Sequence, residues 1–190
     1  MPLVSLWKWA ISAESALCRL TTIQIRKSKN MSKETTSVKA PAKKRGGRSA
    51  RRRSREFALQ GVYQWLISHT NPVEIDAAAL EAEDFDKAVA EFYRSLLHGV
   101  IDDFVATEEA YKPFVDRDVT TLSPIERGIL LIGTYELKNT ATPYRVVINE
   151  AVELAKSFGG TDGFRYVNGV LDKLVSKLRP YEASGSKDAR

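Results

Sequence analysis

A row of arginines precedes the first strongly apolar segment of the chain and offers guanidinium groups to an anion. Four of them follow one another at spacings of three, one and three, which places them on one face of a helix. They are Arg48, Arg51, Arg52 and Arg55. A helix dipole disfavours cations in its first turn, so the cluster costs helix stability and favours an anionic partner. The alternative is a solvated basic tail, and such runs are also common in nuclear-targeting segments.

A glycine-rich turn offers backbone N–H groups and aromatic rings at a second place. It reads GGTDGFRY over residues 159–166, and N–H groups at a helix start can bind a phosphate or a base edge. Phe164 and Tyr166 could stack on unpaired RNA bases. The alternative is that both rings belong to the core. Asn149 and Asn168 lie on either side of the turn, and we expect them to tie helices together, because an asparagine near a core must be hydrogen-bonded.

The sequence contains no recognisable catalytic motif. Neither Gly46-Gly47 nor Gly159-Gly160 matches a nucleotide-binding glycine motif, and the two histidines are too few for a Ser-His-acid set. The single cysteine, Cys18, excludes an internal disulfide and a cysteine zinc site, and it fits a reducing cytosol. We therefore predict a cytoplasmic protein that is not an enzyme and has no metal or cofactor.

Charge is divided unevenly along the 190 residues, whose net charge is +5. Residues 31–55 hold ten bases and one acid, whereas residues 72–118 hold thirteen acids and four bases. A chain divided in this way can bind phosphate at one end and a basic protein at another. The alternative for the acidic part is a solvated surface.

Apolar residues recur with a helical period throughout the second half of the chain, and no segment alternates as a strand would. The pattern predicts an all-α fold of six or seven helices with short connections. Residues 124–138 are apolar nearly all round, which predicts a buried central helix. Ser123 and Asp162 are expected to cap helices. The predicted helices are 49–68, 72–80, 84–99, 100–111, 124–138, 143–158 and 163–178.

The two ends of the chain lack the residues of a core. Residues 1–48 form a predicted disordered, basic N-terminal extension, and residues 181–190 a flexible tail. Lys8, Glu14 and Arg19 interrupt the first apolar segment, so it cannot span a bilayer. Because residues from Met31 onward are typical of a cytosolic amino terminus, we hypothesise that residues 1–30 come from an over-long gene model.

Three segments together resemble the NusB family of bacterial transcription antitermination factors. They read RRRSREFALQGVYQWL, SPIERGILLIGTYEL and TPYRVVINEAVELAKSFGGTDGFRYVNGVLDKL, and the resemblance covers about residues 49–180. It implies a compact helical protein of two small bundles. It also implies a non-enzymatic factor that pairs with the ribosomal protein NusE, binds boxA RNA of ribosomal RNA leader transcripts and helps RNA polymerase resist termination.

The resemblance also implies functional residues. RNA would be bound by the arginine cluster with Arg53, by Tyr63 in the first helix, and by Asp162 and Tyr166 after the turn. The family often has Ser-His where this chain has Gly163-Phe164, so the family implies no contact from these two. NusE would meet the middle helices and the following loop. We place this contact at Phe92, Tyr93, Leu96, Asp116 and Asp118.

Two other interpretations remain open. A similar helical domain precedes the cofactor domain of ribosomal RNA cytosine methyltransferases, and a helical adaptor could bind protein alone. Some family members form homodimers through the face that holds the RNA arginines, which would block that face.

Overall fold

The computed structural model describes the backbone of residues 47–184 and the side chains of residues 50–182. These residues belong to the compact unit Gly46–Arg190. The predictions of a disordered extension 1–48 and of an untranslated segment 1–30 fall outside the described residues, except for residues 47 and 48, which lie in the first turn of a helix. So does most of the expected tail, although its first residues form a short helix.

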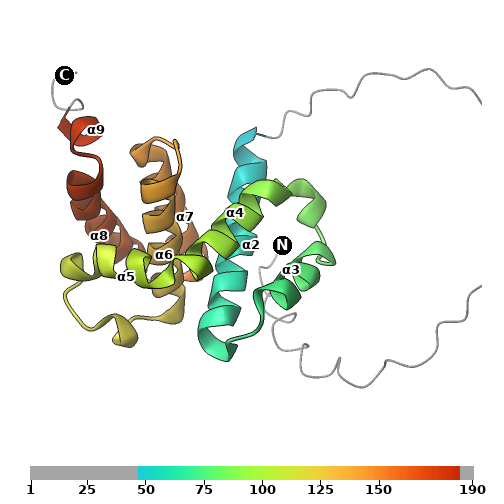
Figure 1. The fold of residues 1–190 in the computed structure, drawn as a ribbon. Coiled ribbons are helices and arrows are strands. Elements are labelled where there is room, and N and C mark those ends of the chain that lie inside the picture. Colours follow the sequence, from blue (N-terminus) through green and yellow to red (C-terminus); the bar gives the residue numbers. More distant parts are fainter. Residues whose placement is uncertain (1–46, 185–190) are drawn as a thin grey trace, which may run out of the picture. The chain divides into compact units, whose positions relative to one another are not determined.

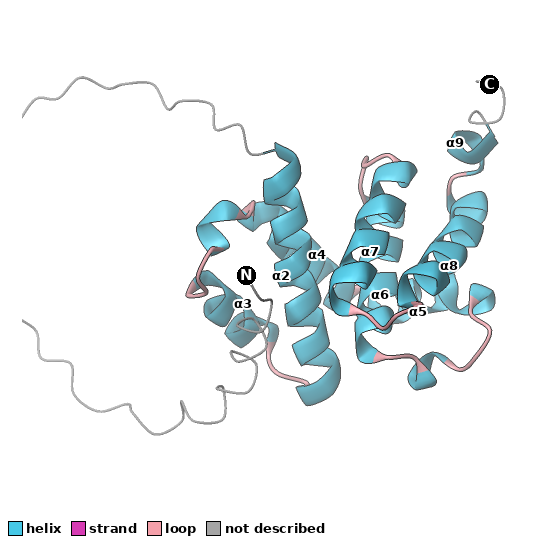
Figure 2. Ribbon diagram, turned by 180° about the vertical axis from the view of Figure 1, so that it is seen from behind, coloured by secondary structure: helices cyan, strands magenta, loops and turns pink. Residues whose placement is uncertain are grey.

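Helices account for all the regular structure of the described residues, as the sequence predicts, and Figure 2 shows them joined by loops alone. The α-helices are α2 (Gly47–Ser68), α3 (Pro72–Leu80), α4 (Ala90–Asp102), α5 (Phe104–Tyr111), α6 (Pro124–Asn139), α7 (Tyr144–Phe158), α8 (Gly163–Leu178) and α9 (Pro180–Ser184). Three single turns of 3-10 helix connect them: η2 (Phe85–Lys87), η3 (Lys112–Phe114) and η4 (Val119–Thr121). None of the described helices is long and apolar enough to cross a membrane.

The helices form two small bundles, which confirms the expected architecture. Helices α2, α3 and α4 pack against one another, and helices α5 to α8 form the second group (Figure 1). Helix α6 packs against members of both groups. Its residues from Gly128 to Thr134 are all buried, together with Glu136 and Leu137, so the prediction of a buried central helix is correct.

The connection from α3 to α4 differs from the predicted helix 84–99. Asp84 takes a left-handed φ of 70° and Val89 is extended, so α4 begins only at Ala90. The buried Ser54 of α2 replaces the missing helical hydrogen bonds, because its hydroxyl accepts from the Val89 N–H at 2.8 Å and lies 3.0 Å from the Val89 carbonyl. The contact with Ser54 therefore moves the start of α4 from the predicted residue 84 to Ala90.

Helix α4 also passes through Gly99, where the sequence predicts its end. A Cβ atom at this position would collide with the ring of Tyr135 on α6, so the glycine allows close helix packing. The break comes at Asp103, whose carboxylate accepts a hydrogen bond from Lys138 Nζ at 2.8 Å. Lys138 thus ties the junction of α4 and α5 to α6.

Two of the predicted caps are absent, and a cap that was not predicted appears at the start of the expected helix 72–80. Neither Ser123 nor Asp162 makes a capping hydrogen bond with its side chain. Asn71 does, accepting from the Val73 N–H at 2.9 Å at the start of α3. Asn71-Pro72 therefore begins a helix as well as ending one.

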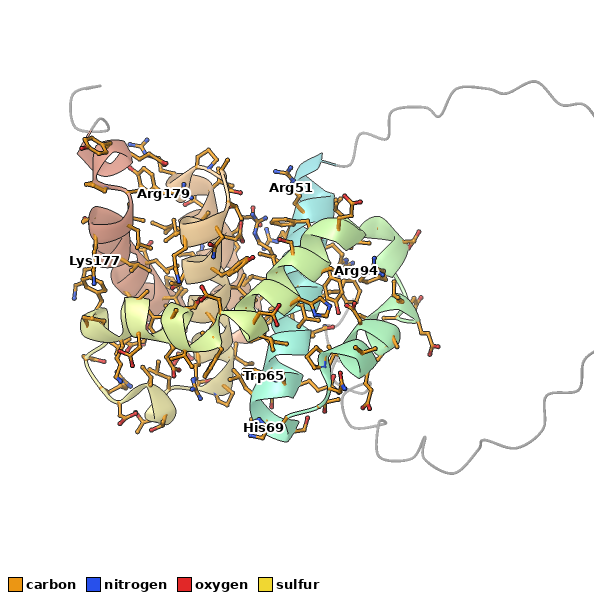
Figure 3. The ribbon with its side chains drawn as sticks, viewed as in Figure 1. Arg51, Trp65, His69, Arg94, Lys177 and Arg179 are labelled. Carbon is orange, nitrogen blue, oxygen red and sulfur yellow. The ribbon has the colours of Figure 1, made fainter. Side chains whose placement is uncertain are left out.

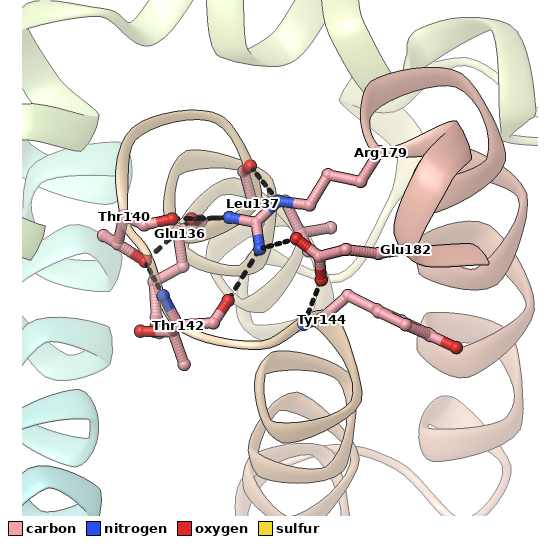
Figure 4. Close-up of polar contacts among 7 residues, drawn as sticks. All are labelled: Glu136, Leu137, Thr140, Thr142, Tyr144, Arg179 and Glu182. Atoms are coloured by element: carbon pink, nitrogen blue, oxygen red, sulfur yellow. Dashed lines mark hydrogen bonds and ion pairs between the residues drawn. The ribbon is translucent and has the colours of Figure 1, made fainter. Parts of the chain in front are cut away.

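Arg179, which directly follows α8, binds the connection between α6 and α7. Its guanidinium donates to the carbonyls of Leu137 at 2.9 Å and Thr142 at 2.7 Å, and also to that of Thr140 (Figure 4). The last carbonyls of a helix have no partner within the helix. Arg179 supplies donors at the end of α6 and in the turn that leads to α7.

Candidate nucleic-acid interface

Arg55 does not belong to an exposed arginine face. It is 3% exposed, and its Nε and terminal nitrogen donate to the two carboxylate oxygens of Glu136 at 2.7 and 2.8 Å. Glu150 lies 3.8 Å from a further nitrogen of the same guanidinium. The prediction that Arg55 contacts RNA is therefore corrected, because this side chain joins α2 to α6 and α7 inside the protein.

The three arginines before it are presented differently. Arg51 is exposed, lies over the Phe92 ring at 5.6 Å and has no carboxylate partner among the described side chains. Arg52 lies 3.7 Å from Glu56 and 3.3 Å from Glu153, and its side chain is 35% exposed. Figure 3 shows Arg51 at the start of α2, at the other end of the helix from Trp65 and His69.

Arg53 points to another side of the same helix. It lies 2.9 Å from Glu56 and 3.5 Å from Asp84, and its side chain is 31% exposed. Partly exposed ion pairs of this kind contribute only about 0–1 kcal/mol, so a phosphate can replace the carboxylate at little cost. Arg48 lies in the first turn of α2, but its side chain is outside those that the structure describes.

A chain of contacts on α7 connects the start of α2 with the start of α8. Glu153 accepts from Arg52 at 3.3 Å through one oxygen and from Lys156 at 2.8 Å through the other. The hydrogen bond from Lys156, followed by the charge of that lysine and the contact with Arg52, lowers the pKa of Glu153. Lys156 Nζ in turn lies 5.7 Å from the centroid of the Phe164 ring on α8.

The predicted stacking residue, Tyr166, is engaged within the protein. Arg117 covers its ring at 5.0 Å, and its buried hydroxyl has no hydrogen-bond partner by normal geometry. Burial raises the pKa of Tyr166, and the negative charge of Asp116 raises it further. Asp162 is open to solvent, with its side chain 75% exposed and 3.3 Å from Arg165.

The residues predicted to contact a protein partner do not share one surface. Tyr93 and Leu96 are 0% exposed, so the prediction for these two is corrected: they are core residues of α4. Phe92 is half-buried beside Arg51, whereas Asp116 and Asp118 are exposed in the loop between α5 and α6, where Asp116 lies close to Tyr166.

Three further residues concern this interface: Tyr63, which the resemblance selects for RNA binding, and two basic residues that were not predicted. Tyr63 is half-buried on α2. Lys156 and Arg165 are 49% and 76% exposed and both lie near Phe164, yet neither was predicted to bind RNA. Their basic charge close to the glycine-rich turn was the only signal in the sequence. No cluster of histidine, cysteine and acidic side chains within the described part of the chain could hold a metal ion.

Comparison with known proteins gives a consistent result. The NusB family model matches residues 52–176. The transcription antitermination protein NusB of Azoarcus sp. (strain BH72) is 57% identical over 147 residues, which cover 75% of this chain and 95% of the relative. The protein of the same name from Burkholderia ambifaria (strain MC40-6) is 56% identical over 142 residues, covering 74% and 98%.

Solved structures share the fold. T. maritima NusB superposes with a TM-score of 0.62 at 23% identity, covering 71% of this chain and 96% of that one. A chain from the crystal structure of antitermination factors NusB and NusE in complex with dsRNA gives a TM-score of 0.59 at 22% identity, covering 68% and 98%. Because the family model spans well over half of the sequence and the two relatives are 56–57% identical to it, this chain belongs to the NusB family.

Proposed function

We propose that this protein is a non-enzymatic antitermination factor of the cytoplasm. It binds single-stranded boxA RNA of ribosomal RNA leader transcripts together with NusE, and the pair acts in the antitermination complex of RNA polymerase. The observation that carries the proposal is the row of contacts from Arg52 through Glu153 and Lys156 to Phe164. These contacts connect the arginine turn (residues 48–53) with the glycine-rich turn (residues 159–166). We call this row of side chains the basic track.

The charges on this track suit an RNA backbone. Arg51 lacks a carboxylate partner among the described side chains, and the ion pairs of Arg52 and Lys156 are partly exposed. Arginine and lysine that neutralise phosphates release bound counterions, which gives affinity that falls as salt rises. We therefore assign RNA backbone contact to Arg51, Arg52 and Arg53, with Arg48 as a fourth candidate.

Relatives support both partners. The curated relatives carry the name of a transcription antitermination protein, and one solved relative was crystallised with NusE and dsRNA. A basic ribosomal protein would be attracted by residues 72–118, whose net charge is −9, because complementary charge speeds encounter. We keep Phe92, Asp116 and Asp118 as candidate contacts for NusE, since their side chains reach the surface.

A salt titration tests the RNA proposal. The double substitution R51A/R52A removes two cations of the track, so boxA RNA should bind more weakly. The dependence of log K on log salt should also become shallower, by roughly 0.7 for each phosphate that the variant no longer neutralises. The measurement is fluorescence anisotropy of labelled boxA RNA, with and without NusE, across a range of salt.

The control is K177A, which removes an exposed cation near the end of α8, away from Arg51 in Figure 3. It should leave the salt dependence unchanged. Equal slopes for R51A/R52A and the unmodified protein would reject the arginine turn as the RNA site. Binding of NusE with no binding of RNA would instead indicate an adaptor for proteins alone.

A further inference from the structure

Tyr166 is the aromatic residue that family resemblance selects for stacking, but its surroundings oppose that role. Arg117 lies over its ring at 5.0 Å, and its hydroxyl is buried beside Asp116. An RNA base that stacks on this ring must first displace Arg117 from it. The ring therefore serves first to hold the loop between α5 and α6 against α8.

Phe164, in the first turn of α8, has different neighbours. Lys156 Nζ lies 5.7 Å from the centroid of its ring, and the guanidinium carbon of Arg165 lies 5.6 Å from it. The two cations come from different helices, the end of α7 and the start of α8. They bring two positive charges to one half-buried aromatic ring at the end of the basic track.

We propose that Phe164, Lys156 and Arg165 form a nucleotide subsite. In this subsite an unpaired base displaces the two cations from the Phe164 ring and stacks on it, and the cations then hold its flanking phosphates. This inference rests on the proposed RNA-binding function and extends it to residues that family resemblance does not select. Proteins that bind single strands combine aromatic stacking surfaces with cations in this way. Phenylalanine carries no hydrogen-bonding group, so the subsite adds affinity without choosing among bases.

The acids near the subsite do not prevent it from binding phosphate. Lys156 pairs with Glu153 at 2.8 Å, and Arg165 pairs with Asp162 at 3.3 Å. The four side chains are 42–76% exposed, and ion pairs this exposed contribute little. Each cation can therefore exchange its carboxylate for a phosphate, and Glu153 keeps Arg52 as a second partner.

The test compares substitutions in the full chain, using a single-stranded boxA oligonucleotide that carries 2-aminopurine. F164L preserves an apolar side chain against the core and removes the aromatic face, so it should weaken binding roughly tenfold and reduce the quenching of 2-aminopurine. F164W should restore both. K156A should make the salt dependence shallower by roughly 0.7, the value for one neutralised phosphate on a single strand. K177A, which removes a cation near the other end of α8, should bind as the unmodified protein does.

Three outcomes separate the possibilities. If F164L weakens binding and F164W restores it, the subsite is supported. If F164L binds normally while R51A/R52A binds weakly, the subsite is rejected and the proposed function stands. If the unmodified protein fails to bind the oligonucleotide both with and without NusE, the proposed function and the subsite are rejected together.

Discussion

Neighbouring arginines in α2 have opposite roles, and their partners decide which role each has. Arg51 and Arg52 reach solvent, whereas Arg55 is enclosed and binds Glu136 with two hydrogen bonds. Spacing alone puts Arg51, Arg52 and Arg55 on one helix face. The difference arises because Glu136 is 81 residues away in the sequence, and only the fold brings it to Arg55. The spacing therefore predicted the helix face on which these side chains lie, but not how far each of them is buried.

Removing Arg55 should destabilise the protein far more than removing its exposed neighbour. In R55A the buried carboxylate of Glu136, 1% exposed, loses its partner, and breaking a buried pair in this way typically costs about 3–5 kcal/mol. R52A breaks only two partly exposed pairs and should cost about 1 kcal/mol or less. Urea unfolding followed by circular dichroism gives both free energies of unfolding.

A double substitution separates loss of the pair from loss of packing. R55M/E136M removes both charges and fills the same space with apolar groups, so it should recover most of the stability that R55A loses. If R55A proved no less stable than R52A, the buried pair would not be what holds α2 to α6.

At the scale of elements, helical periodicity predicted most of the fold. Helices α2, α3, α6, α7 and α8 lie within two residues of the predicted segments, because their apolar stripes match the surfaces that they bury. The region 84–111 differed because tertiary contacts decide its breaks. Ser54 holds Val89 extended, and packing of Gly99 against Tyr135 lets α4 continue. Neither contact is local in the sequence, so periodicity could not reveal it.

The candidate site was predictable only in part, for the same reason. Residue type and spacing identified the arginine turn and the glycine-rich turn as the two places of interest. The link between them depends on Glu153 and Lys156 of α7, and nothing in the sequence connects these two residues with either turn. The engagement of Tyr166 by Arg117 crosses two elements and left no sequence signal either.

Arg179 should govern the stability of the turn between α6 and α7. Its planar guanidinium donates to several carbonyls there, among them those of Leu137 and Thr142. In R179A these acceptors lose a charged donor, and each such hydrogen bond contributes about 1.5–3 kcal/mol. We expect faster hydrogen exchange of the amides of residues 140–147 and a free energy of unfolding lower by about 2–4 kcal/mol.

The matched variants test geometry against charge. R179K keeps the positive charge but cannot reproduce the fork of donors, so it should restore only part of the loss. K173A removes an exposed cation from α8, the helix that directly precedes Arg179, and should change neither the hydrogen exchange nor the free energy of unfolding. Full recovery in R179K would show that charge, and not the hydrogen bonds, stabilises the turn.

At the scale of the whole molecule, the basic and the acidic regions each extend over both bundles. The basic turn opens α2, and most of the acids of residues 72–118 lie on the next three helices and the loops around them. Helix α6 packs against both groups, which fixes the basic track and the acidic region on one rigid body. The proposed RNA and partner sites therefore belong to one body and adjoin each other where Arg51 lies over Phe92.

The buried tyrosines set the alkaline limit of this rigid body. Tyr93 and Tyr111 are both 0% exposed, and burial, reinforced by the charges of Asp76 and Glu108, holds their pKa values well above the usual range. Because the unfolded chain releases these protons first, stability is retained below about pH 10 and falls above it, by about 1.4 kcal/mol per pH unit for each tyrosine. Y93F should reduce that slope by about 1.4 kcal/mol per unit, as measured by urea unfolding between pH 9 and pH 11.5, whereas Y181F, at a position 90% exposed, should leave it unchanged. An unaltered slope in Y93F would mean that Tyr93 ionises in the folded protein as readily as in the unfolded chain.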